Sequence, residues 1–311
     1  MNESQLFKLG SLMETEHTND NSDQNSAVES EDSVNKTLQG LFLILFTVSS
    51  FLVFNVGGYN NFIPVDLILF TRATIVGILV IVTLALYQSK GELNRYWKLS
   101  CSFLIASIGL LFAWIFGRWY TLIPGLSPST VEGAAIAKVA EVLPIVLAIL
   151  VGVWIIEKDL SVLYLNGGNV RKSIKLGIII SPAALFVFVA LGGLGFSATP
   201  NEVIAWMPWI CVFAFSNALM EELLIRGLFL RKYESVFGKR GALILTSVIF
   251  ALFHQTIIGF TDILTMAAYF SIPLILGILW GYIIQKSDNI WGAVLAHMIS
   301  DIFFVLVMFG V

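Results

Sequence analysis

The sequence predicts an all-α membrane protein in which a disordered acidic tail precedes a helical bundle of about eight or nine transmembrane helices. Of the 311 residues, 57% are hydrophobic and only 13% are charged, and the mean hydropathy is +0.86. A soluble domain carries about 25% charged residues, so the composition excludes an ordinary soluble protein. The apolar residues also form long runs, and about 20 such residues are enough for a helix to cross a bilayer.

Residues 1–35 form the polar beginning of the chain and are rich in Glu, Asp, Asn and Ser. A segment with so few apolar residues cannot bury enough surface to fold, so we expect a disordered cytoplasmic tail. A cleavable signal peptide needs a basic start followed by an apolar core. Residues 1–35 have neither, and no such peptide is expected.

Nine apolar spans follow the tail, each close to or above the length needed to cross a bilayer. They lie at roughly 38–58, 62–87, 98–122, 133–156, 174–196, 203–229, 240–260, 262–285 and 290–310. The count falls to eight if the fourth span, which begins with Glu132, Lys138 and Glu141, is partly interfacial. Lys138 and Glu141 are three residues apart, and we expect them to pair on a solvated helix start.

Basic residues occur only in alternate loops between these spans. They are Lys90, Arg95, Lys98, Lys158, Arg171, Lys172, Lys175, Arg231, Lys232, Lys239, Arg240 and Lys286. Cytoplasmic loops carry the excess of Lys and Arg, so the N-terminus is expected in the cytoplasm and the C-terminus outside. These loops act as orientation signals, and no nucleic-acid partner is expected.

Two adjacent glutamates interrupt the sixth span. Ionisable side chains within a bilayer are costly and mark a functional site by default. Glu222 and Arg226 are four residues apart, share a helix face and can pair. This pairing leaves Glu221 as the free carboxylate, with Asn217 one turn earlier on the same face.

Two histidines reach depths similar to that of Glu221. Counted from the cytoplasmic ends of their spans at 1.5 Å per residue, Glu221 is roughly 14 Å deep, His254 roughly 20 Å and His297 about 10 Å. Phe250 shares a face with His254, and Asp301 shares one with His297. A carboxylate and two imidazoles could activate water and stabilise an oxyanion, or they could bind a divalent metal.

Three motifs, in order along the chain, resemble those of the CPBP family. They are Glu221-Glu222-x-x-x-Arg226, Phe250-x-x-x-His254 and His297-x-x-x-Asp301. This family comprises the type II CAAX prenyl proteases and the bacteriocin-processing or immunity proteins of the Abi group. The resemblance covers about residues 155–305. It implies an intramembrane protease core at 155–311, preceded by additional transmembrane helices at 36–154.

The resemblance also implies a role for each motif in a glutamate endopeptidase. Glu221 would activate water with help from His254, and His297 with Asp301 would form the oxyanion hole. Glu222 and Arg226 would hold the site together, supported by Asn217 and Phe250. No cofactor is implied; a divalent metal at Glu221, His254 and His297 is the alternative.

Asp301 departs from the pattern of the CAAX-type members, which favour Asn at this position. An ionised aspartate would repel an oxyanion. Asp301 must therefore be protonated, or it must orient His297 instead of donating a hydrogen bond directly. Protease activity is accordingly a firmer expectation than specificity for a prenylated substrate.

Two other functions remain open from the residues alone. A transporter could titrate the buried carboxylates during alternating access, which Asp66, Arg72 and Arg118 in the spans favour and the absence of a visible repeat disfavours. A non-catalytic immunity or scaffolding protein of the same fold could instead bind a peptide or membrane partner.

The expected partners are the lipid bilayer and a membrane-anchored protein or peptide substrate. The expected location is the plasma membrane of a prokaryote, crossed several times, with the active site opening toward the cytoplasm.

Overall fold

The computed structural model describes residues 40, 43–58, 60, 62–190, 195–258 and 262–310. The predicted disordered tail, residues 1–35, lies outside these described residues. The chain forms two units, Met1–Thr47 and Val48–Val311, and the helices and sites below belong to the second. The division into 36–154 and 155–311 stays a prediction.

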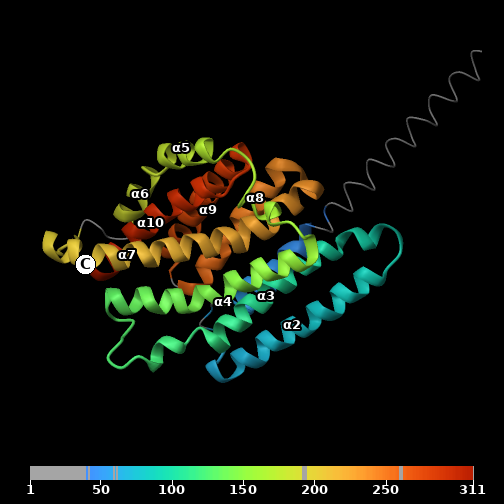
Figure 1. Cartoon of the computed structure of the whole chain (residues 1–311), viewed down its shortest axis with the longest axis horizontal. Coiled ribbons are helices and arrows are strands. Elements are labelled where there is room, and N and C mark those ends of the chain that lie inside the picture. Colours follow the sequence, from blue (N-terminus) through green and yellow to red (C-terminus); the bar gives the residue numbers. More distant parts are fainter. Residues whose placement is uncertain are drawn as a thin grey trace, which may run out of the picture. The chain divides into compact units, whose positions relative to one another are not determined.

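Every regular element in the described residues is a helix, as predicted (Figure 1). The first half of the unit contains η1 (Phe51–Val56), α2 (Val65–Gln88), η2 (Gly91–Tyr96), α3 (Trp97–Phe116), η3 (Trp119–Leu122), α4 (Val131–Glu157) and η4 (Leu160–Leu163). The second half contains α5 (Val170–Ile180), α6 (Ala183–Ala190), α7 (Pro200–Glu221), η6 (Glu222–Leu230), α8 (Arg231–Ile258), α9 (Ile263–Ser287) and α10 (Trp291–Gly310). Of the short elements, η1 and η6 are π-helices and η2, η3 and η4 are 3₁₀ turns.

Within the described residues, 6 helical segments are long and apolar enough to cross a membrane. One of them, Pro200–Gln255, runs through α7, η6 and most of α8. Gly238 interrupts it with φ 67° and ψ 173°, a conformation that glycine adopts without a steric penalty. α8 packs back against η6, and the segment covers the predicted sixth span, 203–229, and most of the predicted seventh span, 240–260.

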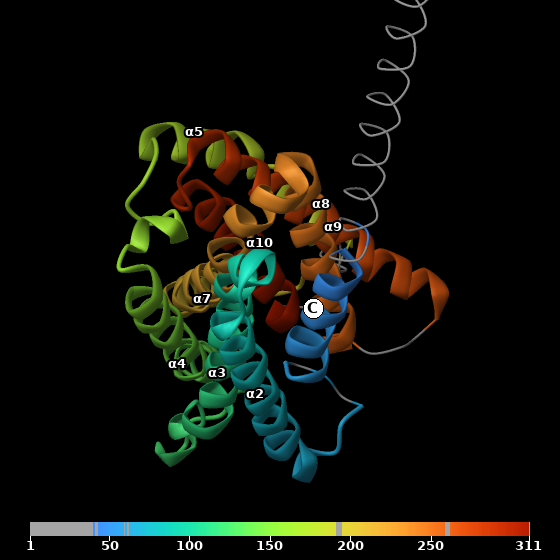
Figure 2. The ribbon, with the colours of Figure 1, turned by 90° about the vertical axis from the view of Figure 1, so that its right-hand side faces the viewer.

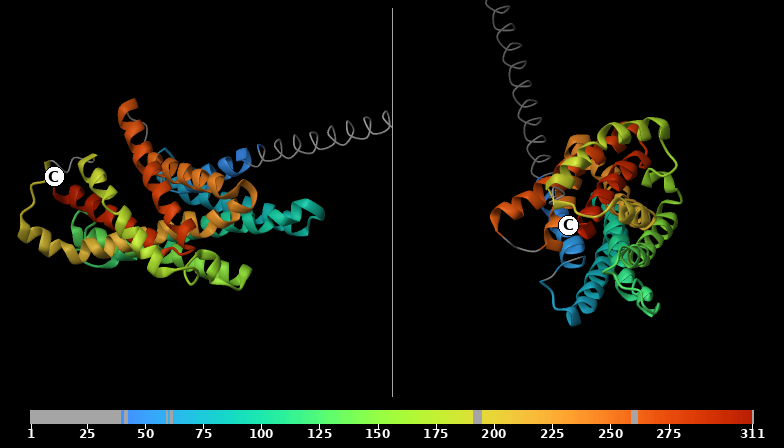
Figure 3. Two further views of the ribbon diagram at one scale, coloured as in Figure 1. Left: turned by 90° about the horizontal axis from the view of Figure 1, so that it is seen from above. Right: turned by 90° about the vertical axis from the view of Figure 1, so that its left-hand side faces the viewer.

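The predicted fifth span, 174–196, is divided in the structure. Its region is occupied by α5, which has 11 residues and already begins at Val170, and by α6, which has 8 residues; each is shorter than a bilayer-crossing helix. Pro182 lies between them, and proline lacks the N–H that would continue the helix. Both short helices pack along α10 (Figures 1 and 3).

α7 lies between α4 and α10 and packs against both (Figure 1). Beyond α4, α3 and then α2 follow in reverse chain order (Figure 2). A capping box starts α7: the Thr199 side chain accepts from the Glu202 N–H, and the Glu202 carboxylate accepts from the Thr199 N–H. This cap secures the helix whose other end carries Glu221.

The first turn of α10 is held by the connection between α4 and α5. The Ile290 N–H donates to the Tyr164 carbonyl at 3.1 Å, and Asn289 Nδ2 donates to the Gly167 carbonyl at 2.9 Å. Backbone groups in a connection need such partners when they are buried. These bonds locate the start of α10, and with it His297 two turns further along.

Candidate active site

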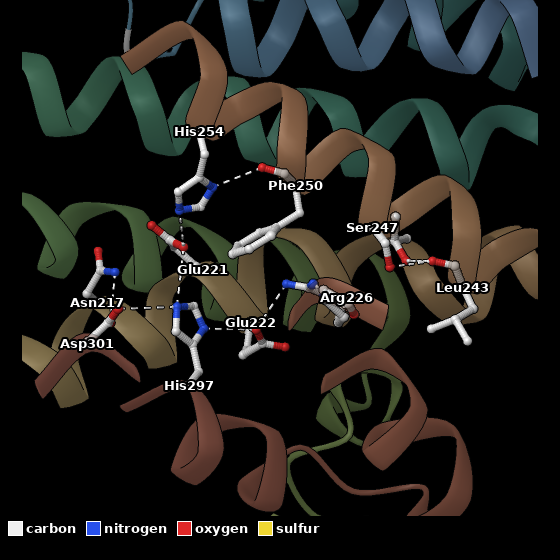
Figure 4. A network of polar contacts seen from close by, with 12 residues as sticks. Asn217, Glu221, Glu222, Arg226, Leu243, Ser247, Phe250, His254, His297 and Asp301 are labelled. Atoms are coloured by element: carbon white, nitrogen blue, oxygen red, sulfur yellow. Dashed lines mark hydrogen bonds and ion pairs between the residues drawn. The ribbon is translucent and has the colours of Figure 1, made fainter. Parts of the chain in front are cut away.

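Glu221 ends α7, and its buried carboxylate lies between two imidazoles (Figure 4). Its Oε2 is 3.8 Å from His254 Nε2 and 3.6 Å from His297 Nε2. Both distances exceed the range of a direct hydrogen bond, and this oxygen has no hydrogen-bond partner among the described residues. Glu221 therefore presents a free acceptor between the two rings.

His254 is held by its own helix. Its Nδ1 lies 2.9 Å from the Phe250 carbonyl oxygen. Because a carbonyl only accepts, Nδ1 carries the proton and Nε2 of the neutral ring is an acceptor. Nε2 thus faces a second acceptor, Glu221 Oε2. A molecule that donates to both would join them, and water is the smallest such molecule.

His297 contacts three carboxylates. Its Nδ1 lies 3.0 Å from Glu222 Oε1, and its Nε2 lies 3.6 Å from both Glu221 Oε2 and Asp301 Oδ1. Because a carboxylate only accepts, the His297 Nδ1 carries a proton and donates it to Glu222. The other nitrogen, Nε2, carries a proton only when the imidazole ring is a cation. Glu222 therefore orients His297, a contact that the sequence motifs did not indicate.

Glu222 also forms the expected pair with Arg226. Arg226 Nη1 donates to Glu222 Oε1 at 3.0 Å, and both side chains are fully buried. They belong to η6, the π-helical segment that continues α7, in which every residue is buried. Such π-helical segments are frequent at functional sites.

Asp301 is held by Asn217, one turn before Glu221. Asn217 Nδ2 donates to Asp301 Oδ2 at 3.0 Å. The other oxygen, Oδ1, is the one that faces His297 Nε2. One carboxylate thus links the Glu221 helix to the His297 helix.

Helix α9 supplies support that sequence reasoning missed. The Trp280 ring stacks on His297 with centroids 3.8 Å apart and planes at 15°. The Gly277 carbonyl accepts from Arg226 Nη2 at 3.2 Å, and a Cβ at Gly277 would come within 3.0 Å of that nitrogen. Because Gly277 and Trp280 carry no charge, only their helical spacing could have indicated a shared face.

The structure brings all eight residues selected from the sequence into one network (Figure 4). They are Asn217, Glu221, Glu222, Arg226, Phe250, His254, His297 and Asp301. Among the residues that the structure describes, no group of three or more His, Cys, Asp and Glu side chains is arranged to hold a metal ion. Metal independence and the individual roles stay predictions.

A protein-family model described as Type II CAAX prenyl endopeptidase Rce1-like matches residues 203–303. This segment is Rce1-like. It contains all eight residues of the network, and the match confirms the resemblance to the CPBP family. Residues 203–303 are therefore similar to a family of prenyl endopeptidases. No curated protein and no solved structure matches the chain.

Proposed function

We propose that this protein is an intramembrane glutamate endopeptidase that hydrolyses a peptide bond of a membrane-anchored protein or peptide. The observation that carries the proposal is the free oxygen of Glu221, which faces two imidazole nitrogens at 3.6 and 3.8 Å within the Rce1-like segment. Peptide hydrolysis needs a general base and an oxyanion donor close together in a site shielded from bulk water. A carboxylate between two imidazoles can supply both.

The first step is activation of water. A water molecule held between Glu221 Oε2 and His254 Nε2 donates to both acceptors. As its oxygen bonds to the scissile carbonyl carbon, one proton passes to Glu221. A base positioned in this way accelerates hydrolysis by about 10²- to 10⁴-fold.

The second step is stabilisation and collapse of the tetrahedral intermediate. The carbonyl oxygen takes up an electron pair, and His297 Nε2–H donates to the resulting oxyanion. Collapse breaks the C–N bond, and the proton on Glu221 passes to the leaving nitrogen. The products are one new carboxyl group and one new amine.

Asp301 acts in this proposal on His297 and not on the oxyanion. Its Oδ2 accepts from the Asn217 amide, which suits a carboxylate, and its Oδ1 faces His297 Nε2. An ionised Asp301 favours the protonated His297 that the oxyanion needs. This arrangement accounts for Asp where CAAX-type relatives favour Asn.

The proposed substrate is held in the bilayer by a membrane anchor, and prenylated proteins are its leading class because the matching family model describes a CAAX prenyl endopeptidase. The alternation of basic loops supports a site that opens toward the cytoplasm. A prokaryotic plasma membrane is the proposed location.

The test is cleavage of a panel of membrane-tethered peptides, with and without a prenyl group, by purified protein. We expect Glu221→Gln to lower the cleavage rate by about 10²-fold or more. The exposed Glu132 provides the matched control, and Glu132→Gln should cleave as the wild type does. A chelator should have no effect.

Each of the other outcomes contradicts a separate part of the proposal. Full activity in Glu221→Gln would remove the base role from that residue. Chelator sensitivity would assign the same residues to a metal site. If wild-type protein cleaves none of the peptides, a partner-binding or immunity role replaces the protease.

A further inference from the structure

The π-helix η1 packs against α8, although it lies far outside the Rce1-like segment (Figure 2). Asn55 of η1 is 1% exposed, and its Nδ2 donates to the Leu252 carbonyl of α8 at 2.7 Å. Leu252 comes two residues before His254. η1 therefore bonds directly to the turn of α8 that carries one of the two imidazoles of the site.

This turn of α8 is close to the end of its helix. α8 ends at Ile258, and the last carbonyls of a helix have no partner within it, so helix ends fray. The His254 ring is held by the Phe250 carbonyl of the same helix, at 2.9 Å from Nδ1. The position of His254 Nε2, 3.8 Å from Glu221 Oε2, therefore depends on the backbone of this turn.

Phenylalanine rings surround the bond from Asn55. The Phe54 ring meets the Phe253 ring edge to face, with centroids 6.4 Å apart, and the Phe229 ring in the same manner at 5.7 Å. All three side chains are at most 1% exposed. A buried carbonyl that loses its donor in such surroundings is left with a desolvation cost, so the amide has a strong hold on α8.

The end of η1 is itself fastened. Asn60 Nδ2 donates to the carbonyls of Asn55 and Val56, both at 3.0 Å, and Asn60 Oδ1 accepts from the Ile63 N–H at 3.1 Å. These bonds fix the backbone from which the Asn55 side chain extends.

Charged side chains of the early spans have partners inside the protein. Lys138 Nζ pairs with Glu141 Oε2 at 2.8 Å, as expected, but with side chains 19% and 21% exposed the pair is partly buried and not on a solvated helix start. Arg72 donates to the Gly58 and Leu110 carbonyls, both at 2.7 Å. Arg72 of α2 thus ties the chain that follows η1 to α3.

We propose that Asn55 is a positioning residue for His254. Its amide fixes the last turns of α8 and so holds the imidazole at the distance from Glu221 that activation of water needs. The proposal rests on the proposed protease function and extends the site to a helix outside the Rce1-like segment. Because Asn55 acts on the backbone of α8 and not on the substrate, its loss should slow the chemical step and leave substrate binding unchanged.

The first test is the kinetics of Asn55→Leu, which keeps the approximate shape of the side chain and removes the donor. We expect kcat for a membrane-tethered peptide to fall by about tenfold or more, with KM unchanged. Ser50→Ala is the matched control, because Ser50 Oγ contacts Tyr233 Oη at 3.4 Å near the other end of α8. This variant should keep the wild-type kcat. Unchanged kcat in Asn55→Leu, or an equal loss in Ser50→Ala, overturns the proposal.

The second test observes His254 without any cleavage. The chain has three histidines, and the ring C–H signals of protein labelled with ¹³C-histidine are recorded by nuclear magnetic resonance, with His254→Ala to identify that of His254. Asn55→Leu should shift the His254 signal and leave the other two in place, and Ser50→Ala should shift none.

The two tests separate failure of the positioning role from failure of the protease. If wild-type protein cleaves nothing but the His254 signal shifts as expected, Asn55 positions His254 and the protease function fails. An unshifted His254 signal overturns the positioning role whatever the activity. Asn55→Ala makes the same comparison if Asn55→Leu does not fold. If neither variant folds while Ser50→Ala does, Asn55 is a general stabilising residue and the proposal is overturned.

Discussion

Glu221 and Glu222 are adjacent in the chain but have different surroundings. Glu222 Oε1 accepts from both Arg226 and His297 at 3.0 Å, whereas Glu221 Oε2 has no hydrogen-bond partner among the described residues. One residue along a helix turns the side chain by about 100°, so the two carboxylates face different neighbours. Glu222 Oε1 holds Arg226 and His297, and Glu222 Oε2 is buried without a hydrogen-bond partner among the described residues. The oxygen that lies between the two imidazoles is Glu221 Oε2, which makes Glu221 the residue available for chemistry.

Glu222→Gln should therefore destabilise the protein, whereas Glu221→Gln should not. The first change leaves the buried Arg226 without its ionic partner. Removing one member of a buried pair costs roughly 3–5 kcal/mol. Thermal unfolding of both variants in detergent measures the difference, and equal midpoints would contradict the structural role of Glu222.

At the scale of elements, the position of His297 depends on a close crossing between α5 and α10. A Cβ at Gly292 would lie 1.9 Å from the Ser173 carbonyl oxygen, and one at Gly177 would lie 2.4 Å from the Gly292 oxygen. Small residues allow helix backbones to approach this closely. The Gly292 N–H also donates to Ser173 Oγ at 2.9 Å, so the crossing fixes the depth of α10.

Gly292→Ala should separate these two helices and move His297 away from Glu221. Forcing extra atoms into a packed interior costs about 1–3 kcal/mol, and cleavage should fall with stability. Gly77→Ala on α2 is the control, because a Cβ there meets nothing within 4 Å. Thermal unfolding and the cleavage rate are measured together; a stable, active Gly292→Ala protein would show that the crossing can relax.

The connection between α4 and α5 carries a titratable group outside the spanning helices. Burial raises the pKa of Tyr164 from its ordinary value of 10.0 to about 12. The folded protein thus holds the phenolic proton more tightly than the unfolded chain. The resulting stabilisation is complete below pH 10 and is lost as the pH rises from 10 toward 12.

Tyr164→Phe should therefore lose less stability than wild type over this pH range. The free energy of unfolding at pH 9, 10 and 11 provides the comparison. Tyr87 is 59% exposed, and Tyr87→Phe should follow the wild-type curve. Identical curves for Tyr164→Phe and wild type would mean that Tyr164 titrates normally.

At the scale of the whole molecule, the proposed orientation makes opposite predictions for the two ends of α4. Ser129 precedes this helix, and Lys172 lies in the basic region that follows it; both residues are exposed. The positive-inside rule places Lys172 in the cytoplasm and Ser129 outside. A substrate would then reach Glu221 from the side of Lys172.

Single cysteines test this orientation in intact cells. In a variant without Cys101 and Cys211, Ser129→Cys should react with a membrane-impermeant maleimide, and Lys172→Cys should react only after the cells are opened. Recovery of the full-length protein in the membrane fraction shows that both variants insert. The reverse labelling pattern would invert the orientation and place the site opening outside.

The sequence by itself determined the helical membrane class and the residues of the candidate site. A bilayer forces spanning segments to satisfy their own backbone hydrogen bonds, so composition and run length are enough to predict helices. The Glu222–Arg226 pair and the His254–Phe250 contact join residues four apart in one helix. Local helix geometry alone predicts such contacts.

Only the tertiary structure decided how these helices meet. The bond from His297 to Glu222 joins residues 75 apart, and that from Asn217 to Asp301 joins residues 84 apart. The stacking of Trp280 on His297 and the division of the fifth span at Pro182 were likewise not evident from the sequence. These features depend on the rotation and depth of each helix in the bundle. Packing between neighbouring helices sets both quantities, and neither can be predicted from the length of an apolar run or its periodicity.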